Sequence, residues 1–130
     1  MSGTLAVPSG LIDLPIRRAP NSTYERMVGA GGKPSQTAFA VTAYNTDASV
    51  VTVRLLTGRT HQIRVHFAAL GHPLVGDDVY GQVSPAIARQ ALHAHVLRLI
   101  QPLTGAPLTI VAPLPPDIQN LRAAICRTSE

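Results

Sequence analysis

The sequence predicts an α+β fold with a mainly antiparallel sheet and flanking helices. Strand-like segments come in pairs joined by short turns, and segments with helical spacing do not alternate with single strands. Parallel strands need long crossover connections, so this order favours hairpins. The 130 residues contain no repeat and no dividing linker, so residues 1–130 are predicted to form a single domain.

The first predicted hairpin occupies residues 38–56. Phe39, Val41 and Ala43 alternate with Ala and Thr, and Val50 to Leu56 alternate again. Between them, Asn45 to Ala48 have the composition of a turn. This pattern indicates two antiparallel strands with a four-residue loop.

The second predicted hairpin lies nearer the C-terminus. Residues 93–100 and 108–112 are rich in strand-forming residues, and Leu103 to Gly105 form the expected turn. Residues 85–92 are predicted to be a short helix or turn. Residues 1–37 are expected to be loosely structured, with one extended segment from Gly10 to Ile16.

Two helices complete the expectation. In the first, Thr60 is the predicted N-cap and Gly71 the stop, with Ile63, Phe67 and Leu70 at helical spacing. The second begins at residues 115–117, where two prolines precede an aspartate. Its predicted apolar face is Ile118, Leu121 and Ile125.

Charge and composition restrict the partners and the compartment. Eleven basic residues, ten of them Arg, oppose seven acids and give a net charge of +4, which favours a polyanionic partner but also fits a merely basic protein. Cys126 is the sole cysteine, and no apolar run approaches the ~18 residues of a membrane span. A soluble, cytoplasmic protein is expected.

The densest group of polar residues is the segment 57–66, TGRTHQIRVH, where a strand is predicted to run into a helix. Unpaired backbone N–H groups at a helix start attract anions. Arg59, His61 and Gln62 are expected to surround this opening. The pattern favours an anion or nucleic-acid site.

Arg64 lies one turn further along, beside Ile63 and Phe67, and is predicted to be partly buried. A buried guanidinium needs a carboxylate or phosphate close to it. A structural ion pair with Asp77 or Asp78 on the following loop is one way to meet that need.

Together with the segment 71–81, GHPLVGDDVYG, this string resembles the signature of the RluA/RluD family of pseudouridine synthases. The segments 92–94, 102–105 and 112–115 are similar to that family as well, as is the GKPSQT stretch at 32–37. The resemblance covers nearly the whole chain and implies the C-terminal half of the catalytic domain.

The resemblance implies an enzyme that isomerises uridine to pseudouridine in structured rRNA or tRNA, with no cofactor and no metal. The uridine is flipped out of the RNA to react. By this likeness Arg64 is the partner of a catalytic aspartate, and Leu92 is an apolar wall of the uracil pocket. The residues implied to contact RNA are Arg59, His61, Gln62 and Lys33.

The family's Arg-Leu-Asp motif and its base-stacking tyrosine do not occur at matching positions here. The chain is therefore expected to be a partial catalytic domain, inactive alone. Either it belongs to a longer synthase, or it is a short, non-catalytic RNA-binding protein. Half a sheet leaves an open edge, so self-association or pairing with the missing N-terminal half is expected.

A metal site is the remaining alternative, because His93 and His95 share one strand face. A zinc hydrolase would also need a further ligand at matching spacing and a general base. The sequence offers no such set, and no metal is predicted.

Overall fold

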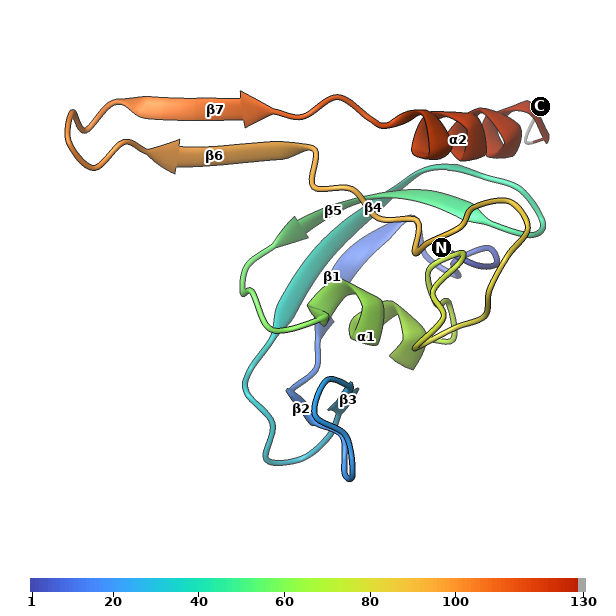
Figure 1. The fold of residues 1–130 in the computed structure, drawn as a ribbon, viewed down its shortest axis with the longest axis horizontal. Helices are drawn as coiled ribbons and strands as arrows, with labels where there is room; N and C mark the ends of the chain where they lie inside the picture. Colours follow the sequence, from blue (N-terminus) through green and yellow to red (C-terminus); the bar gives the residue numbers. More distant parts are fainter. Residues whose placement is uncertain (129–130) are drawn as a thin grey trace.

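The computed structural model describes residues 1–128 as an α+β fold in which every strand pair is antiparallel (Figure 1). The central sheet has the order β1-β4-β5, formed by Ser9–Asp13, Gln36–Tyr44 and Ser49–Leu55. The predicted fold class is confirmed. The strands form three separate sheets rather than one.

The β4–β5 hairpin agrees with the sequence prediction because its turn is encoded locally. The side-chain oxygen of Asn45 accepts hydrogen bonds from the backbone N–H groups of Asp47 and Ala48, both at 2.8 Å. Such local side-chain bonds favour a turn over continued strand. A bulge between Val41 and Ala43 interrupts the register of the two strands.

Helix α1 (Gln62–Ala69) packs on the central sheet (Figure 1). Phe67 is fully buried and meets Phe39 of β4 edge to face, with ring centroids 5.6 Å apart. Ile12 and Leu74 belong to the same core cluster. This contact fixes the helix, and with it the segment 57–66, against the sheet.

The N-terminal region is more ordered than the sequence predicts. The three-residue strands β2 (Ile16–Arg18) and β3 (Arg26–Val28) pair with each other and form a small arm at one end of α1 (Figure 1). Gly32 is required beneath this arm, since a Cβ there would lie 2.7 Å from the backbone carbon of Ile16. The expectation of loose structure across residues 1–37 is therefore wrong.

Strands β6 (Val96–Ile100) and β7 (Pro107–Val111) form the second predicted hairpin, which projects away from the rest of the chain (Figure 1). Its apolar side chains remain exposed, Leu97 to 56% and Ile100 to 63%. Helix α2 (Pro116–Thr128) follows and contacts β4 and β5. Ile125 on its predicted apolar face is buried.

Residues 85–92 form no helix, contrary to one of the two expectations for that segment. The chain instead crosses directly over Gly76, and the Ala91 N–H donates to the carbonyl of Val75 at 2.9 Å. A Cβ at Gly76 would collide with the carbonyl oxygen of Arg89, and the φ of +78° also favours glycine. Neither helix within residues 1–128 is long and apolar enough to cross a membrane.

Candidate nucleic-acid interface

A basic groove lies between the β2–β3 arm and the loop before α1. It has a volume of about 450 Å³, and its lining contains five cationic side chains and no acidic one. The five are Arg17, Arg18, Arg26, Lys33 and Arg59. Clustered cations without a local counter-charge are the electrostatic signature of a site for a polyanion.

Arg59 and Lys33 both line this groove, and their expected contact with RNA stays a prediction. The Arg59 side chain donates from Nε and Nη2 to the carbonyl oxygen of Pro34, at 3.1 and 2.9 Å. This holds the guanidinium against the groove wall. Lys33 is exposed, and its backbone pairs with Ile16 of β2 in both directions.

Gln62 does not face this groove, so its expected RNA contact is wrong. Its side chain is buried, and both its amide oxygen and its amide nitrogen are hydrogen-bonded. Oε1 accepts from the Arg59 N–H at 3.0 Å, and Nε2 donates to the Gln36 carbonyl and to Thr37 Oγ1, both at 2.9 Å. Gln62 is thus a structural residue that shapes the loop carrying Arg59.

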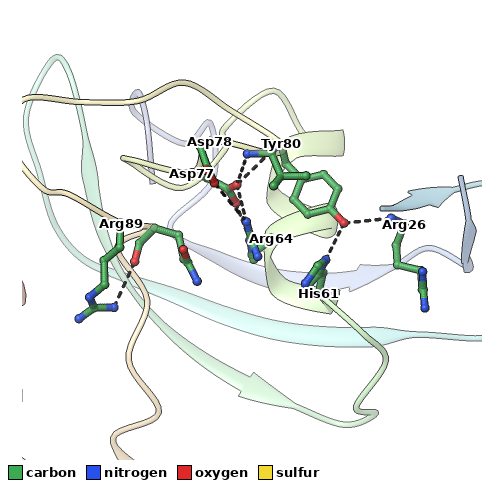
Figure 2. A network of polar contacts seen from close by, with 9 residues as sticks. Arg26, His61, Arg64, Asp77, Asp78, Tyr80 and Arg89 are labelled. Atoms are coloured by element: carbon green, nitrogen blue, oxygen red, sulfur yellow. Dashed lines mark hydrogen bonds and ion pairs between the residues drawn. The ribbon is translucent and has the colours of Figure 1, made fainter. Parts of the chain in front are cut away.

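The predicted N-cap is also wrong, because His61 rather than Thr60 occupies that position. His61 adopts a left-handed conformation with φ of 55° and makes no side-chain cap bond. The Gln62 side chain instead holds the loop before the helix, because its Oε1 accepts the backbone N–H of Arg59. The chain turns sharply at His61, which directs its ring toward Tyr80 (Figure 2).

Arg64 already has a carboxylate from this chain. Its Nε and Nη2 donate to the two oxygens of Asp77, each at 2.8 Å, in a bidentate pair with side chains 11% and 0% exposed. Asp78 lies at 4.0 Å. The structure therefore contains the structural ion pair with Asp77 that the sequence offered for Arg64 (Figure 2), and the role of Arg64 as partner of a catalytic aspartate stays a prediction.

The ionisation of this pair follows from its contacts. Burial opposes the charge of Asp77, but hydrogen bonds from Arg64 and from the Tyr80 and Val79 amides outweigh it, so the pKa is lowered. The hydrogen bond to Asp77 raises the pKa of Arg64. Both groups are charged, and Arg64 is fixed in one orientation.

Tyr80 connects this pair to the basic groove (Figure 2). Its ring lies against Arg64, with the guanidinium carbon 5.2 Å from the ring centroid. Its hydroxyl accepts the backbone N–H of Arg26 at 2.9 Å and lies 2.7 Å from Nδ1 of His61. Burial, with Arg64 and Arg26 nearby, lowers the pKa of His61, which favours a neutral ring whose Nδ1 accepts a hydrogen bond from the Tyr80 hydroxyl.

Leu92 is half-buried and packs against the hydrophobic core. Its carbonyl oxygen accepts a hydrogen bond from Nη1 of Arg89 at 2.9 Å. No contact of Leu92 tests the predicted uracil-pocket role, which stays a prediction.

The histidine pair considered for metal binding is turned toward backbone instead. Nε2 of His93 and Nδ1 of His95 both lie within 3.0 Å of the carbonyl oxygen of Ala112, an acceptor that calls for N–H donors. Within residues 1–128, no group of three or more histidine, cysteine or acidic side chains could hold a metal ion.

Three arginines of the groove were not predicted to contact RNA, namely Arg17, Arg18 and Arg26. The adjacent pair Arg17-Arg18 was the available signal, since neighbouring arginines raise local positive charge. Arg26 carries no such signal, because only the pairing of β3 with β2 brings it beside them.

A groove lined by cations is the electrostatic footprint of proteins that bind polyanions such as nucleic acids. The family model for RNA pseudouridylate synthase matches residues 5–69, half of the chain. The chain belongs to the RNA pseudouridylate synthase family.

The similarity extends to individual proteins. The chain is 48% identical over 119 residues to the uncharacterized RNA pseudouridine synthase YjbO of Bacillus subtilis, covering 92% of this chain and 42% of that protein. It is 42% identical over 125 residues to the ribosomal large subunit pseudouridine synthase D of Nitrosomonas europaea, covering 89% and 36%.

A solved structure agrees with these relatives. Human RNA Pseudouridylate Synthase Domain Containing 1 superposes with a TM-score of 0.74 at 33% identity, over 89% of this chain and 53% of that one. The chain thus spans about two fifths of the length of the curated relatives it matches.

Proposed function

We propose that this chain is the RNA-binding part of a pseudouridine synthase. The synthase isomerises uridine to pseudouridine in rRNA or tRNA when the rest of the catalytic domain is present. The basic groove carries the proposal, because five cations and no acid line an opening of about 450 Å³, and a phosphate backbone is the polyanion that such cations attract. Similarity to a ribosomal large subunit pseudouridine synthase supports rRNA as the substrate. An RNA substrate also supports a cytoplasmic location.

Arg64 fits the role of partner to a catalytic aspartate from outside this chain. Asp77 occupies its Nε and Nη2, which leaves the Nη1 edge as the side from which a second carboxylate would approach. The buried pair keeps the guanidinium charged and oriented for that contact. Because no Arg-Leu-Asp occurs in the sequence, we expect no pseudouridine from this chain by itself.

Substitution of Arg59 tests the RNA-binding part of this proposal. Arg59→Ala should weaken binding to a uridine-containing RNA and reduce the salt slope of log K by roughly 0.7 per lost single-strand phosphate contact. Arg122→Ala on the exposed face of α2 is the matched control. Unchanged affinity and slope for R59A would place RNA elsewhere.

Incubating the chain with such RNA and assaying pseudouridine separates the two readings of catalysis. RNA binding without pseudouridine formation supports an RNA-binding module that needs the rest of the catalytic domain for activity. Product from this chain alone would contradict the proposed need for an external aspartate. A non-catalytic RNA-binding protein is the alternative, favoured if addition of the complementary part of a relative restores no activity.

We further propose that the β6–β7 hairpin packs against the part of the synthase that this chain does not span. Its exposed Leu97, Leu108 and Ile110 lie on one face of the hairpin, and two-stranded hairpins are only marginally stable without cover. Alone, the chain should self-associate at micromolar concentration in light scattering, and Leu97→Lys should reduce this. A monomer at all concentrations would contradict the proposal.

A further inference from the structure

The Tyr80 hydroxyl is a junction between three elements that are far apart in the sequence. Tyr80 lies in the loop after α1, His61 at the start of that helix, and Arg26 on β3 of the basic arm. The hydroxyl accepts from the Arg26 backbone and bonds His61, while the ring lies against Arg64 (Figure 2). One side chain therefore contacts both the groove and the buried ion pair.

The arm that Tyr80 reaches is anchored at its base, where the Ile16 side chain is buried and the Gly29 N–H donates to the carbonyl of Pro15. Its two strands are three residues each, and the backbone bonds that continue them join Ile16 with Lys33 and Ala19 with Glu25. Arg17 and Arg18 of β2 are exposed, and Arg26 is half-buried. The outer part of such a short arm, where the side chains are exposed, moves readily unless a further contact fixes it to the core.

Tyr80 itself is well fixed. Its backbone N–H donates to Asp77 at 3.0 Å, and Asp77 is fully buried and paired with Arg64. His61 meets the Tyr80 ring edge to face, with centroids 5.5 Å apart. The Arg26 amide is thus attached, through one hydroxyl, to the buried Arg64–Asp77 cluster.

We propose that Tyr80 is a positioning residue that fastens the β2–β3 arm to the Arg64–Asp77 pair, so that the groove cations and Arg64 hold one fixed spacing. The inference rests on the proposed RNA-binding function and deepens it. RNA phosphates held by the arm would then lie at a set distance from the Arg64 side chain. Free movement of the arm would preserve the charges and lose that spacing.

Tyr80→Phe is the direct test, because it keeps the ring on Arg64 and removes only the hydroxyl. We expect faster amide hydrogen exchange at Arg26 and a fivefold to tenfold weaker affinity for a structured, uridine-containing RNA, the order of loss for one or two phosphate contacts. The salt slope should also fall. Tyr44→Phe, on the exposed face of β4, is the matched control and should change none of these.

The readouts separate the possible failures. If the unsubstituted chain binds no RNA, the proposed function itself fails. If it binds and Y80F matches it in affinity, salt slope and Arg26 exchange, Tyr80 does not fasten the arm. If Tyr80 only stabilises the fold, Y80F would lower the melting temperature without changing the salt slope of RNA binding. The salt slope therefore separates this role from positioning of the arm, and an unchanged slope would overturn the proposal.

Discussion

The buried side of α1 and the basic groove both contain basic side chains, but those on α1 are hydrogen-bonded within the fold, whereas Arg17 and Lys33 in the groove are exposed. On the buried side, Arg64 is saturated by Asp77, and His66 is bonded on both ring nitrogens, to Thr37 at 2.8 Å and to the Leu14 carbonyl at 2.8 Å. In the groove, the charged ends of Arg17 and Lys33 are exposed with no acid in the lining. Polar side chains that are satisfied inside the fold, such as Arg64, hold its elements together, whereas cations left exposed are available to a ligand.

The largest expected effect is the removal of the buried carboxylate. Asp77→Ala leaves Arg64 buried without its counter-charge, which typically costs about 3–5 kcal/mol. Urea denaturation should show this loss as a lower midpoint at unchanged slope. Asp78→Ala is the control, because Asp78 is exposed and 4.0 Å from Arg64. Equal stability of both variants would mean that the pair contributes nothing.

The second expected effect tests the neighbouring neutral network. Thr37→Val retains the shape of a fully buried residue but removes the hydroxyl that lies between Gln62 and His66. Leaving buried polar groups unsatisfied should cost about 1–3 kcal/mol. Thr42→Val on the exposed part of β4 is the matched control. A neutral result for T37V would show that water replaces the hydroxyl.

The third effect is the pH dependence of folding. The folded-state pKa of Asp77 is lowered, so its contribution is complete above the usual aspartate pKa of about 3.9 and is lost as the pH falls through the lower folded value. Denaturation profiles from pH 7 down to pH 2 should therefore be steeper for the unsubstituted chain than for Asp77→Asn. Parallel profiles would assign the acid sensitivity to other carboxylates.

The smallest expected effect on stability comes from the groove. Arg17→Ala should change the free energy of unfolding by less than about 0.5 kcal/mol, since exposed substitutions seldom do more. The same variant should weaken RNA binding and lower its salt slope. A large loss of stability in R17A would break the contrast between the two regions.

Local sequence signals predicted the fold where the determinants are local. The Asn45 turn, the alternation in β4 and β5, and the apolar face of α2 are all encoded within a few residues. The β2–β3 arm was missed because two three-residue strands carry no periodicity, and their pairing depends on Gly32 approaching the backbone of Ile16.

The candidate site was predicted in part for a similar reason. Desolvation cost alone indicated that Arg64 needs an acid, with Asp77 as a candidate, and the bidentate pair bears this out. The sequence could not tell that Gln62 turns inward while Arg59 turns outward, because a left-handed residue at His61 resets the direction of the chain between them. Tyr80 gave no local signal, since its partners lie 19 and 54 residues away.

The crossing of the chain over Gly76 has a consequence for how the domain tolerates change. The segment through Ile87 and Arg89 lies directly on the backbone at Gly76, next to Asp77. Only the absence of a side chain at Gly76 allows this close approach. Any residue larger than glycine at position 76 would push that segment away from the backbone beside Asp77. The surroundings of the Arg64–Asp77 pair thus depend on a residue that has no charge and no side chain.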